Sequence, residues 1–206
     1  MQWTEHFCDL ALQIFHDAID HYHIKRDVES SPDNPYTFKT IEYMLYQKCW
    51  IDTIQWHMED NMRDPQIDPE EALAVRRHID RCNQDRTDMV ELIDGYFEQK
   101  FENVVLLPDA RINTESPAWA LDRLSILQLK IYHMRVESQR SDTSDAQRET
   151  VKTKLKVLEE QNRDLTKAIT ELLRDIAAGK VVMKVYKQMK MYNDPNLNPV
   201  LYSKKD

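Results

Sequence analysis

Glycine is nearly absent from this chain: only Gly95 and Gly179 occur among its 206 residues. β-Hairpin turns and glycine-rich phosphate loops need backbone conformations that glycine adopts most easily, at several positions each. The scarcity of glycine therefore favours helices throughout and predicts an all-α fold. It also excludes a P-loop and a Rossmann fingerprint, because neither can bring backbone amides close to a phosphate without its glycines.

The composition is that of a globular protein with one core. A length of 206 residues suits a single domain, residues 1–206, and a hydrophobic content of 41% is ordinary for a packed interior. The three cysteines are widely spaced and odd in number, which suits a reducing compartment better than a disulfide framework. The N-terminal residues mix charges into an apolar stretch, unlike a signal peptide, and no long apolar run follows. We therefore expect a cytoplasmic protein without a membrane span.

The net charge of −8 is unevenly distributed. Residues 180–206 contain six lysines and two aspartates, a local charge of +4 that leaves −12 on the rest of the chain. An acidic body argues against nucleic-acid binding. On a helix, one side would carry the lysines Lys180, Lys184, Lys187 and Lys190. That row is most simply a solvated face, and alternatively a contact for phosphate groups or for the acidic body of a second subunit.

Apolar periodicity and capping signals predict five long helices and one short helix. Asp68 before Pro69 and Ser116 before Pro117 have the form of helix N-caps, and Gly179 has the form of a C-terminal cap. The long helices are expected at about residues 3–24, 37–62, 69–99 and 117–137, and from the SDTSD linker to Gly179. The short helix is expected at about 180–191, followed by an extended tail at 192–206. The helix at 117–137 is apolar on nearly all sides, as expected for a helix that the others surround.

The last long helix carries a seam of apolar residues, spaced alternately by three and four positions from Val151 to Ile176, with Asn162 in its one gap. Two interpretations are open: a coiled coil between chains, giving a homodimer through residues 151–176, or packing within the bundle. Additional apolar residues widen the face beyond a strict seam, which favours packing within the bundle. A buried Asn162 would need a matching partner in either case.

Arg86 projects into the middle of the apolar face of the helix at 69–99. A buried, unpaired guanidinium would be strongly unfavourable, so Arg86 should meet a carboxylate or an anionic ligand, or else extend to the surface. Asp122 is the preferred partner, with Asn83 close enough to join a shared polar network and Arg123 adjacent in sequence. Whether this network holds a ligand or only the fold stays open.

The helix at 37–62 carries a continuous polar stripe. The stripe is most simply a solvated face, and alternatively the wall of a cleft, because Trp56 lies in the same sector. Its members are Lys48, Asp52, Gln55, Glu59 and Arg63. His57 projects elsewhere, among apolar residues, where a lone histidine is more often a core residue than a ligand. Acid/base or metal-assisted phosphate chemistry by carboxylates on adjacent helices would use Asp52, Glu59, Asp60, Asp80 or Asp88.

Metal-binding spacings are incomplete. His78 and Cys82 lie one helical turn apart and could face one ion, but no CxxC, HExxH or second HxxxC supplies the remaining ligands. The paired ExxH elements of di-iron bundles are also missing. We therefore expect no metal site, and the identity of any cofactor stays open.

Four segments, in order, carry a resemblance to a bacterial helical family catalogued as a domain of unknown function, number 4254. The segments are KCWIDTIQWHMED, RRHIDRCNQDRTDMVELID, ARINTESPAWALDRLSIL and MKVYKQMKMYNDPNLNPVL, and the resemblance spans about residues 40–201. It implies a helical bacterial protein with a link to cell-envelope glycan synthesis. It also points to a set of site residues: Asp52, Gln55, His57, Glu59, Asp60, Asn83, Arg86, Asp88, Asn113, Glu115, Asp122 and Arg123.

Two functions follow as hypotheses. The first, ranked slightly higher, is a binding or scaffold protein that uses its heptad helix and lysine-bearing tail to self-associate or to hold a protein partner. The second is a small-molecule enzyme or binding protein for an anionic substrate of the phosphate or nucleotide-sugar type. In this second hypothesis Arg86 and Arg123 hold the anionic group, and acid/base work falls to Asp52, His57 or Glu59.

Overall fold

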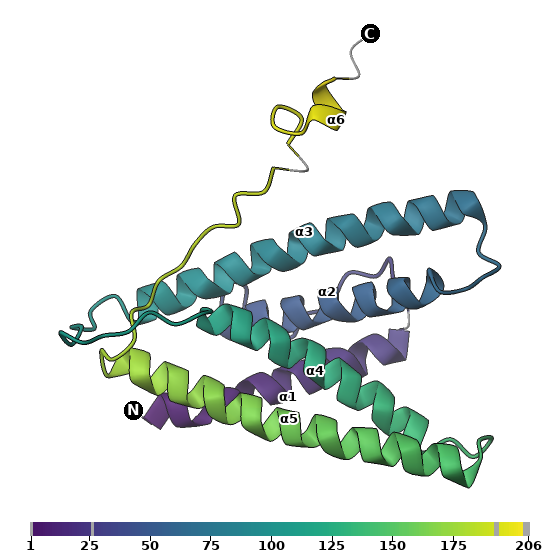
Figure 1. Cartoon of the computed structure of the whole chain (residues 1–206), viewed down its shortest axis with the longest axis horizontal. Coiled ribbons are helices and arrows are strands. Elements are labelled where there is room, and N and C mark those ends of the chain that lie inside the picture. Colours follow the sequence, from purple (N-terminus) through teal and green to yellow (C-terminus); the bar gives the residue numbers. More distant parts are fainter. Residues whose placement is uncertain (1, 26, 192–193, 204–206) are drawn as a thin grey trace.

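The chain folds into a helical bundle. The computed structural model describes residues 2–25, 27–191 and 194–203. Its helices are α1 (Gln2–Lys25), α2 (Ile41–Asn61), α3 (Pro69–Lys100), α4 (Pro117–Ser138), α5 (Asp145–Ala177) and the short α6 (Pro199–Tyr202) (Figure 1). No β-strand forms in these residues, where Arg111 and Val181 make one isolated bridge. The all-α fold with five long helices, predicted from the scarcity of glycine and the apolar periodicity, is confirmed.

The capping signals in the sequence form as predicted. The carboxylate of Asp68 accepts hydrogen bonds from two backbone N–H groups in the first turn of α3, and the hydroxyl of Ser116 accepts one in the first turn of α4. These side chains satisfy N–H groups that have no partner within the helix. Gly179 follows α5 with φ of 71°, the left-handed conformation that glycine adopts without strain.

One predicted helix boundary and one predicted helix are wrong. α2 begins at Ile41 rather than near residue 37, because Thr40 is its N-cap and Lys39 has a positive φ of 69°. Residues 180–191 form no helix. Instead, the backbone of this segment pairs with the loop before α4: the N–H of Val182 donates to the carbonyl of Arg111 at 3.0 Å. Backbone groups bonded across to this loop are not available for helical hydrogen bonds.

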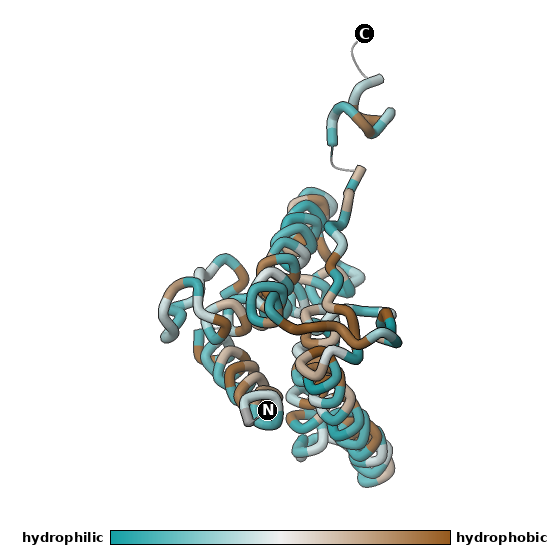
Figure 2. The backbone as a smooth tube through the Cα atoms, turned by 90° about the vertical axis from the view of Figure 1, so that its left-hand side faces the viewer, coloured by the Kyte–Doolittle hydropathy of each residue, from teal (hydrophilic) through white to brown (hydrophobic). Residues whose placement is uncertain are grey.

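The C-terminal segment therefore also lacks the predicted row of lysines on one side of a helix. Its lysines do not share a helix face: Lys180 lies 3.6 Å from Asp175, whereas Lys190 donates to Gln84 of α3 at 3.0 Å. The short helix is α6, within the predicted extended tail 192–206, of which residues 192–193 and 204–206 lie outside the described residues. Figures 1 and 2 show this end of the chain running away from the bundle.

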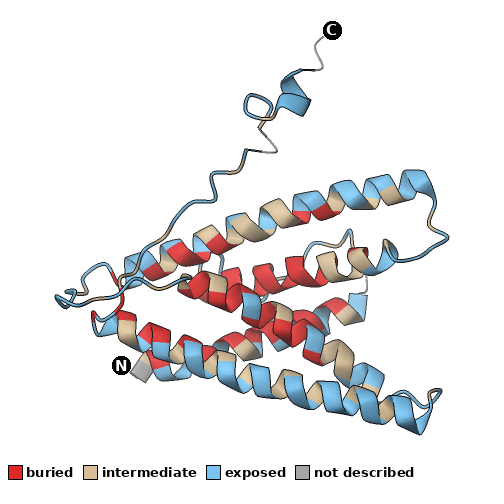
Figure 3. Cartoon of the chain, in the orientation of Figure 1, coloured by how far each residue is buried: buried red, intermediate tan, exposed pale blue. Residues whose placement is uncertain are grey.

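α4 is the central helix. It contacts each of α1, α2, α3 and α5, and half of its residues are buried (Figure 3). This confirms the prediction that the other helices surround it. Burial of apolar side chains from α1, α2 and α4 supplies the main stabilisation of the bundle. No helix in the described part of the chain has an apolar stretch long enough to cross a bilayer.

The seam of α5 packs within the chain, chiefly against α4. The C-terminal half of the seam is buried, whereas the N-terminal half is more exposed (Figure 3). Asn162 finds its partner in the same chain, because its Oδ1 accepts a hydrogen bond from Nε2 of Gln128 at 2.9 Å. Oε1 of Gln128 in turn lies 3.2 Å from Nε2 of His16. The homodimer through residues 151–176 stays a prediction.

Candidate functional site

α2, α3 and α4 enclose four charged side chains. Lys48 and Asp52 lie on successive turns of α2, Arg86 on α3 and Asp122 on α4. Lys48, Asp52 and Asp122 are buried, with 1%, 5% and 2% of their surface exposed, while the side chain of Arg86 is 24% exposed. Two positive and two negative groups make the set neutral overall. We call these four residues the ionic network.

The ionic network is closely connected. Nε of Arg86 donates to Oδ1 of Asp122 at 2.7 Å, and Nη2 donates to the other oxygen, a bidentate pair. Nζ of Lys48 lies 2.8 Å from Oδ1 of Asp122 and donates to Oδ2 of Asp52, which also accepts from the hydroxyl of Ser125 at 2.6 Å. The predicted partnership of Arg86 and Asp122 is confirmed. The solvated-face interpretation is wrong for Lys48 and Asp52, because their sector of α2 faces α4.

The pKa values of the two buried carboxyl groups are shifted in opposite directions. Burial raises the pKa of Asp52, even though Lys48 opposes the shift. Asp122 is also stripped of water, but the hydrogen bonds from Arg86 and the charge of Lys48 hold its pKa below the usual range. Such a divergence suits one carboxyl to proton exchange and the other to a permanent negative charge.

A cavity of about 410 Å³ opens beside the ionic network. Its lining combines charged and apolar side chains: Asp52, Gln55, Trp56, Glu59, Asp60, Arg63, Arg86, Ile126 and Leu129. Among the described residues, Oδ1 of Asp52 has no hydrogen-bond donor and is buried from solvent, with Nε of Arg86 3.7 Å away. A buried carboxylate oxygen without a donor is costly, so its presence in a cavity wall calls for an explanation. The cleft-wall interpretation of the α2 stripe agrees with this cavity.

Most residues predicted for the site gather around this cavity. Asp52, Glu59, Asp60 and Arg86 line it. Asp122 does not line the cavity, but it accepts a hydrogen bond from Arg86, which does. Asn83 contributes at the α2–α3 contact, where its Oδ1 accepts a hydrogen bond from Nε2 of Gln55 at 3.0 Å.

Asn113, Glu115 and Arg123 lie elsewhere, near the start of α4. Nη1 of Arg123 donates to Oε1 of Glu115 at 3.0 Å, and Nδ2 of Asn113 donates to the backbone carbonyl of Glu115 at 2.9 Å. Asn113 and Glu115 line a separate cavity of about 180 Å³. Arg123 cannot join the ionic network with Asp122, because consecutive residues project about 100° apart around a helix. Its side chain is 64% exposed.

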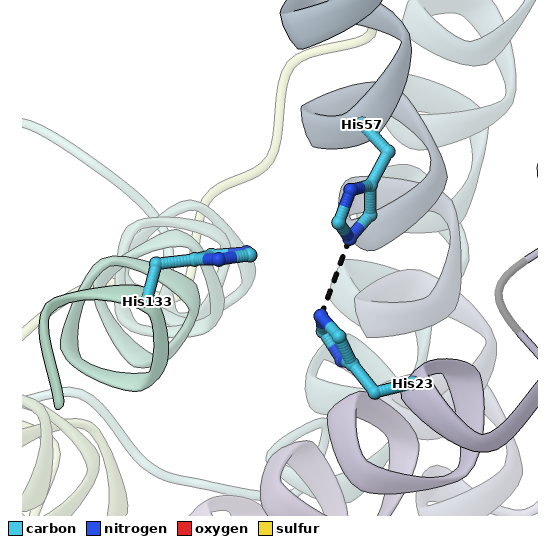
Figure 4. Close-up of side chains that lie close together, drawn as sticks. All are labelled: His23, His57 and His133. Carbon is cyan, nitrogen blue, oxygen red and sulfur yellow. Dashed lines mark hydrogen bonds between the residues drawn. The ribbon is translucent and has the colours of Figure 1, made fainter. Parts of the chain in front are cut away.

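His57 also lies apart from the ionic network, beside two histidines from other helices. His23 of α1 and His133 of α4 point toward it (Figure 4), and Nε2 of His23 is 3.3 Å from Nε2 of His57. One ring nitrogen from each of the three lies within 4.8 Å of the others. Among the described residues, no other group of three histidine, cysteine or acidic side chains is close enough to hold a metal ion. We call these three residues the histidine trio.

The histidine trio has one ring with a marked pKa shift. Burial, together with the neighbouring His57 and His23, lowers the pKa of His133 to about 4, so this imidazole is neutral at pH 7. Its Nε2 is buried and has no hydrogen-bond partner in the described part of the chain. Sequence reasoning missed the trio, since the three histidines lie on three helices and share no short motif. His78, considered earlier with Cys82, instead lies 3.2 Å from Glu29.

Comparison with known proteins gives a family match. The family model described as "Protein of unknown function (DUF4254)" matches residues 42–185. The matched residues contain the whole ionic network, its cavity, and His57 and His133 of the histidine trio. No curated protein and no solved structure matches the chain. The resemblance predicted from four sequence segments is thus confirmed over most of the chain, although the match ends before the C-terminal tail. The chain belongs to the DUF4254 family.

Proposed function

We propose that this protein is a small-molecule enzyme whose substrate binds in the cavity between α2, α3 and α4 and exchanges a proton with Asp52. The supporting observation is that Asp52 lines the cavity and that its buried Oδ1 has no donor among the described residues. A substrate hydroxyl or amine in the cavity would supply that donor. This satisfies the oxygen and places a proton within reach of a carboxyl group.

The ionic network gives each of its members a role in this proposal. Lys48 and Ser125 fix Oδ2 of Asp52, which leaves Oδ1 for the substrate. Burial raises the pKa of Asp52, a property common among groups that transfer protons. Asp122 stays ionised and orients Arg86, whose guanidinium forms part of the cavity wall. Asp52 is therefore the proposed catalytic residue, and Lys48 and Asp122 are positioning residues.

The cavity lining favours a substrate rich in hydroxyl groups over a bare anion. Three carboxyl groups face the cavity against two arginines, and Arg63 and Arg86 each have a carboxylate within 4.0 Å. A hydroxyl both donates and accepts hydrogen bonds, so it suits a wall of mixed charge, and Trp56 offers an apolar surface. A sugar phosphate or nucleotide sugar would place its sugar inside and its anionic group at the rim near the exposed Arg63. Such a substrate accords with a role in cell-envelope glycan synthesis.

Thermal-shift screening tests the proposal. Sugar phosphates, nucleotide sugars and nucleotides would be compared on the wild type, on Asp52→Asn, and on Asp164→Asn as an exposed control on α5. A ligand at 100 times its dissociation constant stabilises the folded state by about 2.7 kcal/mol. We expect one class to stabilise the wild type and the control, and Asp52→Asn to lose turnover of that ligand in an NMR assay of product. A wild type stabilised by no compound, or full turnover by Asp52→Asn, would contradict the proposal.

A second candidate function is binding of a protein partner, favoured by the C-terminal segment. Tyr186, Met189 and Val200 of this segment expose more than half of their surface. Exposed apolar side chains of this kind are typical of contact surfaces. Sedimentation velocity over a range of concentrations tests both this segment and a homodimer through residues 151–176. A monomer at all concentrations would remove self-association.

We also propose a cytoplasmic location. The three cysteines, Cys8, Cys49 and Cys82, are all free and buried. Free thiols are typical of proteins that fold and stay in a reducing compartment. Fractionation of cells that express the chain with its native N-terminus tests this location, and recovery outside the cytoplasm would contradict it.

A further inference from the structure

Three imidazole rings converge between α1, α2 and α4 with nearly equal spacing (Figure 4). The ring centroids of His23, His57 and His133 are 5.2, 5.4 and 5.4 Å apart in pairs, and the ring planes are inclined by 66°, 65° and 69°. These values describe an approximately three-fold arrangement. A zinc ion bound tetrahedrally by three imidazoles at about 2.0–2.1 Å holds the ring centres about 5 Å apart.

The ring nitrogens support the same geometry. The 3.3 Å between Nε2 of His23 and Nε2 of His57 equals the separation, about 3.3 Å, of two nitrogens on a tetrahedral zinc ion. Nδ1 of His23 lies 2.7 Å from the backbone carbonyl of Ile19. A carbonyl only accepts, so Nδ1 carries the proton, and in the neutral ring Nε2 then carries the lone pair, as in metal-binding histidines oriented by an outer hydrogen bond. The buried Nε2 of His133 has no partner among the described residues.

We propose that His23, His57 and His133 form a binding site for one divalent transition-metal ion, with Zn²⁺ the best-matched ion. Three neutral imidazoles are borderline-soft ligands that suit zinc better than Mg²⁺ or Ca²⁺, which take oxygen ligands. The site goes beyond the proposed function and does not depend on it. No short spacing in the sequence predicts it, because each helix supplies one ligand.

Aromatic neighbours hold the three rings in place. The ring of Tyr22 stacks on His57 at 5.1 Å and 14°, and that of Trp56 stacks on His133 at 4.9 Å and 5°. The ring of Tyr132 lies 4.2 Å from that of His23. Side chains fixed in this way lose little freedom when they bind an ion, and one nitrogen of each ring already lies within 4.8 Å of the others.

The histidine trio faces open space on one side. A cavity of about 520 Å³ is lined by all three histidines and by residues that include Asp27 and Asn61. Three protein ligands with one open position are the arrangement of catalytic rather than structural zinc sites, so an oxygen-bearing ligand or water would take the fourth position. Trp56, which stacks on His133, also lines the substrate cavity beside Asp52. The two sites are therefore neighbours that share contact with Trp56.

Equilibrium dialysis of the untagged full chain against ZnCl₂ tests the proposal, with zinc measured by mass spectrometry. The variants are His133→Gln and His57→Gln, with His78→Gln as the matched control, since His78 lies outside the trio and beside Glu29. We expect one zinc ion per wild-type chain and per control chain. Loss of an outer hydrogen-bond partner of a metal ligand lowers metal affinity roughly 10- to 100-fold. Loss of a ligand itself, in His133→Gln or His57→Gln, should lower zinc affinity by more than this.

Two measurements on the folded wild type keep the test independent of how the variants fold. Cobalt(II) should give the strong visible absorption of a tetrahedral site, and zinc titration should move the imidazole NMR signals of the three histidines together. Asp52→Asn should keep full zinc binding, which separates this proposal from the proposed enzyme activity. Absence of stoichiometric zinc in the wild type, or wild-type affinity in folded His133→Gln, would overturn the site and leave a packing cluster of rings.

Discussion

Lys48→Met is the most direct test of the ionic network. Lys48 is 1% exposed, and its ammonium group lies between Asp52 and Asp122, 2.8 Å from Oδ1 of Asp122. Methionine keeps an unbranched apolar stem of similar length and removes the charge. The variant leaves two buried carboxyl groups with Arg86 as their one cationic partner in the ionic network.

The expected loss of stability follows from two opposing effects. Two unit charges about 4 Å apart attract each other by about 4 kcal/mol at an effective dielectric constant near 20, and Lys48 makes two such contacts. About 8 kcal/mol of attraction is therefore lost. Several kcal/mol return because an ammonium group no longer has to be buried, and protonation of Asp52, whose pKa burial raises, relieves more. We expect the free energy of unfolding to fall by about 3–5 kcal/mol, the usual range for breaking a buried ion pair.

Urea unfolding followed by circular dichroism measures this loss, with the slope m checked for constancy. Lys167→Met is the matched control, because Lys167 is 75% exposed and lies 3.9 Å from Glu171, so its removal should change stability by less than about 1 kcal/mol. The double variant Lys48→Met/Asp52→Asn restores neutrality by leaving only Arg86 and Asp122. It should be more stable than Lys48→Met alone. A loss below about 1 kcal/mol for Lys48→Met, or no recovery in the double variant, would refute this electrostatic reasoning.

Two further predictions concern the ends of α4 and α5. Burial raises the pKa of Asp94 from 3.8 to about 6, although Ser116 and the N–H of Ala118 donate to it. The folded chain therefore holds a proton that the unfolded chain has lost, and this contribution to stability is full below about pH 4 and lost as the pH rises through about 6. Asp94→Asn cannot ionise, so its stability relative to the wild type should increase between pH 4 and 7 by up to about 3 kcal/mol in urea titrations, and an unchanged difference would contradict the assignment. Gly179→Ala should lose about 2 kcal/mol or more of stability, because φ of Gly179 is 71° and the new Cβ would lie 2.2 Å from the carbonyl oxygen of Val105. Gly95→Ala should gain about 0.5–1 kcal/mol, because Gly95 lies within α3 and a Cβ there would enter open space. Equal thermal shifts for the two variants would be inconsistent with strain at Gly179.

Local signals predicted most of the fold. Two glycines, regular apolar spacing and caps such as Asp68 and Ser116 are properties of short segments, and they determine where helices begin and end. The helix predicted at 180–191 is wrong because that prediction used local signals alone. Its lysine spacing fits a helix, but its backbone bonds to Arg111 and the neighbouring loop, a contact between distant segments that no local pattern records.

The sequence predicted the part of the ionic network in which an unpaired charge would be energetically costly. A guanidinium amid the apolar face of α3 had to have a partner, and the almost wholly apolar α4 offered Asp122. Lys48 and Asp52 gave no such signal, because alternating charges along α2 are equally typical of a solvated face. Only the packing of α2 against α4 distinguishes the two interpretations, and that packing depends on the tertiary arrangement.

The position of α2 explains why one helix serves two sites. α2 contacts α1 along one side and α3 and α4 along the other, so successive residues can face different partners. Asp52 and Trp56, one turn apart, line the substrate cavity, whereas His57, the next residue, turns toward Tyr22 and His23 of α1. A helix with solvent on one side would expose such residues. Because α2 is enclosed, its polar side chains must be satisfied by neighbouring helices or by ligands. Among the described residues, Oδ1 of Asp52 on α2 and Nε2 of His133 on α4 are buried without a hydrogen-bond partner, and each belongs to one of the two proposed sites.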